Sequence, residues 1–368
     1  MADINLTAAD LAAVPVGGTI HEDVMNAIYD VSPVDRPFCD AIGTGDAGNT
    51  YKEWVREQLE AANSSNARVD GSSSAGIQEQ VTGERIGNYH QIMTKTVRVS
   101  DRGRNSDTIN SSDELVRQLM KRQKALRRDE EAAYTSKNEA IAGDGDTVAG
   151  QLCGVGSWIG VKVKDVASTT SDRGATGVDG VLTGDSSGGG GFVTTAATAG
   201  TKRALSEASV KNMMRAAYLN GGNPTIAMST PACIEVFSDY LFTSSARVAT
   251  LQSDVSSSNR TDNGTGGGRS GGGVTAQGAV NIFVTNYGTL ELVPNRFQDE
   301  VATDVADLYL IDPDTWERCY LQGYETKELA RDGLAENREI SVDCSLIALN
   351  PEANAIIGDL DTSLAATV

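Results

Sequence analysis

The residues that could carry out catalysis are few in this sequence, and their spacing forms no active-site motif. Histidine occurs only as His21 and His90, and neither has a nucleophile motif near it. The G-x-S-x-G pattern occurs only within the Gly/Ser-rich runs, at 184–188 and 268–272, and we predict no nucleophile elbow of the α/β-hydrolase kind, which joins a strand to a helix. We therefore predict that the protein is not an enzyme. The alternative from a different class is a soluble hydrolase, which would depend on His90 or Asp312.

Three segments carry partial signatures of ligand-binding loops. NGTGGGRSGGG (263–273) lacks the Gly-Lys-Ser/Thr ending of a phosphate loop, so we interpret it as a surface loop. GDGDTVAG (143–150) has the first acids of a calcium loop without its closing glutamate, and a turn that ends a helix is the alternative. IDPDTWE (311–317) predicts a turn between two strands, because Asp-Pro-Asp favours turns. We predict no metal and no cofactor.

The cysteines are five in number, far apart, and form no CxxC pair. We therefore expect reduced thiols in a cytosol, with no disulfide framework and no zinc site. The first residues carry acids where a signal peptide needs bases, and no apolar run is long enough to span a membrane. A secreted adhesin is disfavoured for the same reasons. The cysteines are Cys39, Cys153, Cys233, Cys319 and Cys344.

The charge and composition limit the possible partners and the size of the core. A net charge of −19 repels nucleic acid and argues against a DNA-reading protein, but not against one that lies beside DNA without gripping it. Hydrophobic residues make up 39%, and glycine (39 residues) far exceeds proline (8 residues). At 368 residues, we expect either one large elaborated domain or two to three ordinary ones, with long loops and arms.

The longest regular element predicted is a helix over 111–143, capped by Ser111, Ser112 or Asp113 and ended by Gly143. At 1.5 Å per residue it would be a rod of about 45 Å. Its basic run KRQKALRR (121–128) is followed directly by three acids, so we expect a solvated or inter-subunit face rather than a nucleic-acid patch. Its narrow apolar stripe consists of Leu115, Leu119, Leu126, Ala133 and Ala140.

The remaining pattern predicts an α+β protein. Residues 1–45 read as an arm with a short helix at 21–30, which Pro33 and Pro37 stop. A helix at 202–222 carries Leu205, Val210 or Ala208, Met213 and Ala217. Further elements are a strand at 225–230, a helix at 231–242 that starts with Pro231, and strands at 279–286, 289–295, 306–312, 317–323 and 338–350.

A long polar arm separates two predicted strands, 50–59 and 91–100, which we expect to pair with each other. The arm is rich in Ser, Gly and Asn, and loops of this length are uncommon within compact domains. Such an arm has too few apolar side chains to fold on itself, so it needs another surface to lie on. In a protein made in many copies, that surface is usually another copy.

Five segments, taken in order, resemble the major capsid proteins of tailed bacteriophages, in the branch called SU-ten-like. They are DRPFCDAIGTGDAGNTYKEWVREQL (35–59), NYHQIMTKTVRVSDR (88–102), ELVRQLMKRQKALRRDEEAAY (114–134), YGTLELVPNRF (287–297) and LYLIDPDTWERCYLQGYETKELARDG (308–333). The resemblance implies the Hong Kong 97-type fold, which has an N-terminal arm, an extended E-loop hairpin, a spine helix in a peripheral domain, and an axial domain.

Mapped onto this chain, the resemblance implies an arm at 1–45 and an E-loop hairpin at 46–103. It implies a peripheral domain at 104–200 with the spine helix at 112–142 and a Gly/Ser-rich insertion. Residues 201–300 would form the axial domain, and 301–368 would return as strands to the peripheral domain.

The resemblance also implies a function, namely self-assembly into the icosahedral shell that encloses the double-stranded DNA genome of a tailed phage. The partners would be other copies in pentamers and hexamers, scaffolding and portal proteins, and in some phages decoration proteins. The protein would be found in the virion, after assembly in the bacterial cytoplasm. An encapsulin-like nanocompartment is the nearest alternative. Residues expected at the assembly interface are Tyr51, Trp54, Arg68, Asp70, Ile77, Tyr89 and Arg98.

Overall fold

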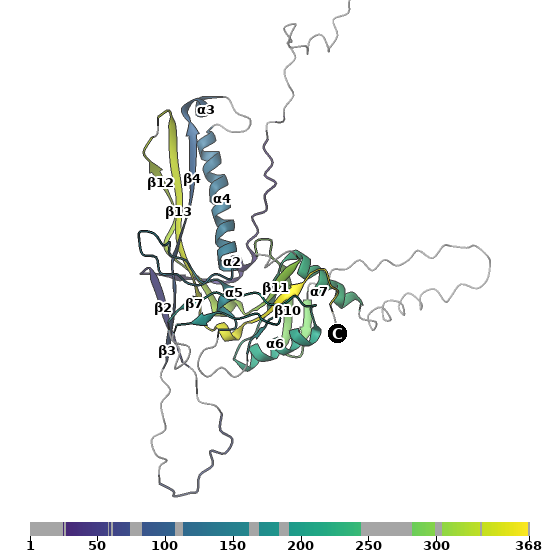
Figure 1. Ribbon diagram of the computed structural model, residues 1–368. Coiled ribbons are helices and arrows are strands. Elements are labelled where there is room, and N and C mark those ends of the chain that lie inside the picture. The colour runs from purple at the N-terminus through teal and green to yellow at the C-terminus, as the bar shows by residue number, and fades with distance from the viewer. Residues whose placement is uncertain are drawn as a thin grey trace, which may run out of the picture.

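A computed structural model gives the fold of the chain (Figure 1). None of its described helices is long and apolar enough to cross a membrane. The structure describes residues 25, 27–57, 59, 62–73, 83–106, 113–161, 169–183, 191–243, 282–298, 304–331 and 333–366.

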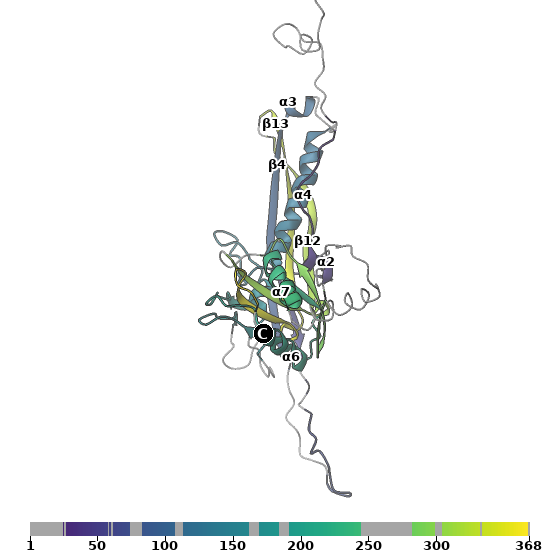
Figure 2. The same ribbon diagram turned by 90° about the vertical axis from the view of Figure 1, so that its right-hand side faces the viewer.

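An elongated four-stranded sheet forms one end of the molecule. Its strand order is β1-β12-β13-β4, with β1 parallel to β12 and the other pairs antiparallel. Figures 1 and 2 show its long strands, together with the helix that lies along them, extending well beyond the body of the protein. The strands are β1 (Gly43–Asp46), β12 (Trp316–Leu329), β13 (Ala335–Ala348) and β4 (Gln91–Ser100).

Helix α4 (Glu114–Tyr134) lies along this sheet, beside β4 (Figure 1). It begins at Asp113, whose carboxylate accepts a hydrogen bond from the backbone amide of Leu115 at 3.0 Å. Its apolar stripe faces inward, since Leu115 and Leu126 are buried and Leu119 and Ala133 pack against the core. The short helix α3 (Asp101–Asn105) connects β4 to this region and is capped by Ser100.

A second, six-stranded sheet has the order β5-β14-β11-β8-β10-β9. Along β11 every residue is buried, because alternate side chains enter two different cores. Leu308 and Leu310 face helices α6 (Glu207–Leu219) and α7 (Pro231–Thr243), whereas Tyr309 and Ile311 face the core shared with the four-stranded sheet. The strands are β5 (Ser171–Asp172), β14 (Ala355–Asp361), β11 (Val305–Ile311), β8 (Ile226–Ser229), β10 (Gly288–Pro294) and β9 (Ile282–Thr285).

Short elements fill the junction between the two sheets. Trp158, Trp316, Tyr134 and Phe38 are among the largest fully buried side chains there. The α+β class predicted from the sequence is therefore confirmed. The short elements are α2 (Pro37–Ala41), α5 (Val155–Trp158), the two-stranded sheets β2 (Tyr51–Arg56) with β3 (Glu84–Tyr89) and β6 (Val181–Leu182) with β7 (Val193–Thr195), and the 3-10 turns at Pro313–Thr315 and Pro351–Ala353.

The long helix ends earlier than the sequence predicts, at Tyr134 instead of near 142 or 143. The hydroxyls of Thr135 and Ser136 donate to the carbonyls of Glu131 and Ala133, which occupies acceptors of the last turn. Ala140 is buried as expected, but in a non-helical segment whose amide at 140 donates to Val193. Twenty-one helical residues make a rod of about 32 Å.

The predicted arm helix at 21–30 is wrong for the residues that the structure describes. Residues 27–30 are not helical, and the side chains of Tyr29 and Val31 are more than four-fifths exposed. Pro37 begins helix α2 rather than stopping an earlier one, since proline fits the first helical position.

The predicted pairing of 50–59 with 91–100 is also wrong. Strand β4 has the predicted bounds, but it pairs with β13, while β2 pairs with β3. Strand β3 is not predicted from the sequence, because its residues, ERIGNY, are mostly polar or glycine.

The C-terminal strands divide between the two sheets. Strands β12 and β13 join the four-stranded sheet, as expected of 301–368, whereas β11 and β14 join the six-stranded sheet. The segment 301–368 thus contributes strands to both sheets. Helix α6 begins at Glu207, five residues later than predicted, and buries Met214 more completely than Met213.

Candidate assembly surfaces and polar clusters

The hairpin of β2 and β3 carries the polar arm away from the body of the protein. Its register pairs Tyr51 with Tyr89 and Arg56 with Glu84. Residues 62–73 lie far from both sheets, at the lower end of Figure 1, and every one of them is exposed. The arm therefore presents a surface that the rest of its own chain does not cover.

A turn shapes this arm where Arg68 and Asp70 lie. The amide of Ser72 donates to the carbonyl of Val69 at 3.1 Å, and Gly71 takes a φ of +75°, which favours glycine. Val69 is 80% exposed between the two charged residues. The predicted interface residues Arg68 and Asp70 are thus free of the core, while Ile77 lies outside the described residues.

Three other predicted interface residues, Tyr51, Trp54 and Tyr89, form the root of the hairpin. The indole Nε1 of Trp54 donates to the Ala348 carbonyl at 2.9 Å, and its ring packs on Trp158 at 5.8 Å between centroids. The rings of Tyr51 and Tyr89 lie 4.6 Å apart, and burial raises the pKa of Tyr51 to about 12. These side chains attach the hairpin to its own subunit.

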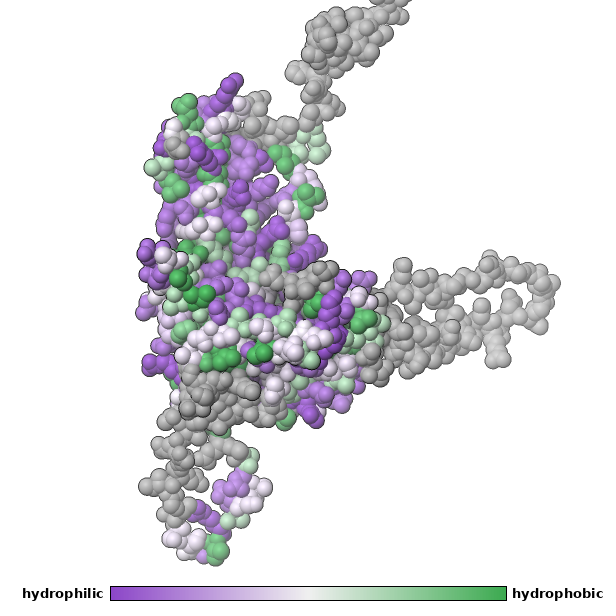
Figure 3. Space-filling model, viewed as in Figure 1, coloured by the Kyte–Doolittle hydropathy of each residue, from purple (hydrophilic) through white to green (hydrophobic). Residues whose placement is uncertain are grey.

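Arg98 lies apart from the hairpin, on strand β4. It is exposed and pairs in register with Asn337 of β13. Figure 3 shows a largely hydrophilic surface along this end of the molecule, with apolar residues scattered over it. The structure therefore does not bring Arg98 together with the hairpin tip.

A Cys-His-Asp cluster, which sequence reasoning did not find, lies where the hairpin meets the four-stranded sheet. Nε2 of His90 is 4.0 Å from Sγ of Cys319, and Nδ1 is 3.4 Å from Oδ1 of Asp343. This order resembles a cysteine-nucleophile triad. Cys319 is fully buried, however, and burial raises the pKa of its thiol to about 11. The thiol is therefore neutral and inaccessible, so the cluster is not a nucleophilic site.

Two acidic segments considered for ligand binding form local turns. The carboxylate of Asp144 accepts hydrogen bonds from the amides of Asp146, Thr147 and Val148, in a turn that follows no helix directly. Asp312 caps the 3-10 turn between β11 and β12, which confirms the predicted turn. Among the described residues, no group of three His, Cys, Asp or Glu side chains could hold a metal ion. The 263–273 loop lies outside them.

The basic run on α4 is partly used within the chain. Arg127 lies over the ring of Tyr324 at 5.6 Å and Arg128 over Phe297 at 4.9 Å. Lys124 pairs with Asp30 of the arm at 3.3 Å. Lys121 and Arg122 are exposed. The solvated face that the sequence predicts is therefore limited to part of the run.

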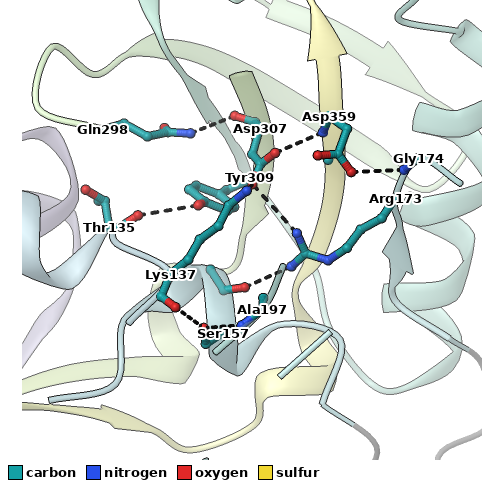
Figure 4. A network of polar contacts seen from close by, with 12 residues as sticks. Thr135, Lys137, Ser157, Arg173, Gly174, Ala197, Gln298, Asp307, Tyr309 and Asp359 are labelled. Atoms are coloured by element: carbon teal, nitrogen blue, oxygen red, sulfur yellow. Dashed lines mark hydrogen bonds and ion pairs between the residues drawn. The ribbon is translucent and has the colours of Figure 1, made fainter. Parts of the chain in front are cut away.

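Figure 4 shows a buried ionic network between the two sheets. Asp307, on β11, is 1% exposed and lies 2.6 Å from Nζ of Lys137 and 3.8 Å from Arg173. Its other oxygen accepts from the amide of Asp359, whose carboxylate accepts from Gly174. Two cations and a backbone amide thus surround the Asp307 carboxylate, while the Asp359 carboxylate is held by the Gly174 amide, and the network connects β11 and β14 to the segments that carry Lys137 and Arg173.

Residues 5–361 match the model of the family described as SU10 major capsid protein. The chain belongs to this family. It is also 25% identical over 357 residues to the major capsid protein of Escherichia phage Phieco32, covering 90% of this chain and 92% of that protein. The resemblance stated from the sequence is therefore confirmed, and the protein is a major capsid protein of a tailed phage.

Solved capsid structures share the fold at low sequence identity. The Cyanophage A-1(L) capsid asymmetric unit matches with a TM-score of 0.54 and 14% identity, over 97% of this chain and 100% of that one. The capsid of a native GTA particle matches with a TM-score of 0.53 and 10% identity, over 97% and 99%. These likenesses show the Hong Kong 97-type α+β fold. They do not favour the encapsulin alternative for function.

Proposed function

We propose that this major capsid protein assembles through pentamers and hexamers into an icosahedral shell around double-stranded DNA, and that the hairpin tip lies on a neighbouring subunit. The proposed tip contact rests on a difference in exposure between the tip of the hairpin and its root. Residues 62–73 are exposed throughout, whereas Trp54 fixes the root to Ala348. A projection anchored at one end and uncovered at the other is suited to an inter-subunit contact.

Such contacts join unlike surfaces, and rings close when the rotation between subunits is right. Many weak contacts of this kind reinforce one another across a shell. The net charge of −19 supports a container that does not bind the packaged DNA tightly. Scaffolding and portal proteins, and decoration proteins in some phages, are the further partners that we propose. Assembly would take place in the host cytoplasm, without an enzymatic activity of the subunit.

We assign the parts of the fold as follows. The arm is 1–45, and the E-loop is the hairpin from 51 to 89 rather than all of 46–103. The four-stranded sheet with α4 would form the peripheral domain. The six-stranded sheet with α6 and α7 would form the axial domain, which therefore takes β11 and β14 from the 301–368 segment.

The interface residues are reassigned in the same way. Arg68 and Asp70 are the proposed contacts with the neighbour, and Ile77 stays in the proposal from its sequence position. Tyr51, Trp54 and Tyr89 would hold the root, and Arg98 would contribute a separate exposed site.

Deleting residues 62–73 tests the proposal. We expect a chain that is soluble and folded, with an unchanged thermal unfolding midpoint, but that forms few or no shells by size-exclusion chromatography and electron microscopy. Replacing the segment with a Gly/Ser linker of equal length is the matched control for chain connectivity, and it should assemble as poorly as the deletion. Normal shells from both variants would overturn the tip contact, and unfolding of the deletion variant would place the tip in the subunit's own core.

A further inference from the structure

His90 links the hairpin to the four-stranded sheet. It is the single residue between β3, which belongs to the hairpin, and β4, which belongs to the four-stranded sheet. Its backbone amide donates to the carbonyl of Thr50, the residue just before β2, at 3.0 Å. Both strands of the hairpin are therefore joined to the sheet at His90, and any swing of the hairpin relative to the sheet displaces this residue.

The sheet is irregular opposite the same point. The register between β12 and β13 shifts between Tyr320 and Gln322, which face Cys344 and Asp343. Such a shift is a β-bulge or a similar irregularity, and bulges bend the strand that carries them. The carboxylate that faces His90 thus lies where the long sheet is least regular.

The imidazole is enclosed by three elements with different charges. Asp343 comes from β13 and Cys319 from β12, and Lys52 of β2 acts on the ring through its positive charge. Neither Nδ1 of His90 nor Oδ1 of Asp343 has a well-formed hydrogen bond among the described residues, because their separation of 3.4 Å is long. The neutral ring is therefore held between the hairpin root and the sheet by packing, with its side chain only 2% exposed, and not by a hydrogen bond to Asp343.

We propose that His90 is a proton-sensitive latch that holds the hairpin root against the four-stranded sheet while its ring is neutral. The groups that fasten the root nearest His90 are neutral, whereas at the far end of β2 Arg56 pairs with Glu84 and with Glu352. Asn88 binds backbone groups of Cys153 and Leu346, and Ser345 donates to the Tyr89 carbonyl. Of these fastenings, only the imidazole changes charge between pH 5 and 7.5.

The direction of the effect follows from the environment of the ring. Burial lowers the pKa of His90 below its ordinary value of 6.5, Lys52 lowers it further, and Asp343 opposes both without reversing the change. A histidine with a lowered pKa stabilises the closed form above pH 6.5. That stabilisation is lost as the pH falls from 6.5 through the folded-state pKa. Acid therefore favours a displaced root in which His90 is hydrated.

Hydrogen exchange on shells and on the dissociated full-length chain tests the latch. Between pH 7.5 and 5, after correction for intrinsic exchange rates, we expect the opening constant of β2 and β3 amides to rise by up to about tenfold per pH unit below pH 6.5. In His90→Gln this rise should disappear. His21→Gln is the matched control, because His21 and His90 are the only histidines, and it should behave like the unmodified chain.

Asp343→Asn gives a second, signed test. Without the carboxylate that raises it, the pKa of His90 in the closed root falls further, so the rise in opening should still begin near pH 6.5 but continue to lower pH and become larger. An unchanged pH response in His90→Gln, or a smaller rise that ends at higher pH in Asp343→Asn, would overturn the latch.

If the His90 and Asp343 variants do not fold, the latch can still be tested by a measurement that leaves both residues unchanged. In the dissociated chain with labelled histidine, the NMR signal that persists in His21→Gln reports His90. We expect it to titrate below pH 6.5, and titration at or above that value would also overturn the proposal. Because these tests concern the subunit, their outcome is independent of whether the tip contacts a neighbour.

Discussion

Glu131 of helix α4 accepts a hydrogen bond of 2.9 Å from the backbone amide of Phe38, in the first turn of α2. Its second oxygen accepts from the amide of Cys39 at the same distance, and Asn295 donates to the first at 2.8 Å. The Glu131 side chain is fully buried. One carboxylate therefore joins α2, α4 and the loop after β10, which are far apart in the sequence.

We predict that Glu131→Gln lowers the free energy of unfolding by about 2–3 kcal/mol. The amide keeps one acceptor oxygen, but its NH₂ group would face a backbone N–H and leave a buried donor without a partner. Urea unfolding followed by tryptophan fluorescence measures the loss. Asp129→Asn is the control on the same helix, because Asp129 is exposed and its pair with Lys95 should contribute less than about 1 kcal/mol. Equal losses in the two variants would contradict the assignment.

Lys137→Met should cost about 3–5 kcal/mol, because it leaves the buried carboxylate of Asp307 with only the more distant Arg173 as a cationic partner. Thermal or urea unfolding of the full chain measures the effect. Lys211→Met is the matched control, since Lys211 is half-exposed in its pair with Glu207 and should change stability by less than about 1 kcal/mol. A loss below 1 kcal/mol at Lys137 would show that the network relaxes around the substitution.

Local sequence patterns predicted the elements that are determined by residues close together in the sequence. Helix α7 begins at Pro231, β4 has the expected bounds, and Asp312 forms the expected turn. The class and family also followed from the sequence, because several segments in order carry more information than any one of them.

Strand β3 and the sheet partners escaped the sequence analysis because the deciding contacts are distant along the chain. Asparagine is typical of loops, yet Asn88 is fully buried. Its side-chain amide donates hydrogen bonds to the carbonyls of Cys153 and Leu346, which lie 65 and 258 positions away. For the same reason, the sequence could not predict that the indole of Trp54, a residue expected at the assembly interface, bonds to Ala348, 294 positions away. The exposed tip was easier to predict, because its lack of apolar residues is itself a local property.

Trp54→Phe should loosen the hairpin root without unfolding the protein. The ring is kept, but the Ala348 carbonyl loses its donor, which costs about 1 kcal/mol, or roughly fivefold in local opening. Hydrogen exchange of β2 and β3 amides measures the change. Val55→Ala is the control from the adjacent, 60% exposed position, and it should leave exchange at the root unchanged. Faster exchange in Val55→Ala alone would contradict this anchoring role for Trp54.

Glu114 predicts a specific acid sensitivity at the start of α4. Hydrogen bonds from Arg117 and Gln118 lower its pKa from 4.5 to about 2. A carboxyl with a lowered pKa stabilises the folded state above about pH 4.5, and this contribution is lost as the pH falls towards 2. Because the site is near the surface, the effect should stay below about 1 kcal/mol. The stability difference between the unmodified chain and Glu114→Gln should therefore shrink from pH 6 to pH 2. A constant difference would show that the loss has another cause.

Gly71→Ala separates the shape of the tip from the stability of the subunit. Gly71 has a φ of +75°, and a Cβ there would meet no atom within 4 Å, so the substitution strains only the local turn, by about 1 kcal/mol. Since residues 62–73 are exposed throughout, the tip can relax without disturbing the core, and the thermal midpoint should not change. The relaxed turn no longer holds Arg68 and Asp70 in one orientation, so shell yield by electron microscopy should fall. Gly48→Ala is the control, because its Cβ would also meet open space but its φ is not in the left-handed region. Normal shells from Gly71→Ala would mean that the turn is not part of the contact, and a lowered thermal midpoint would mean that the tip packs on its own subunit.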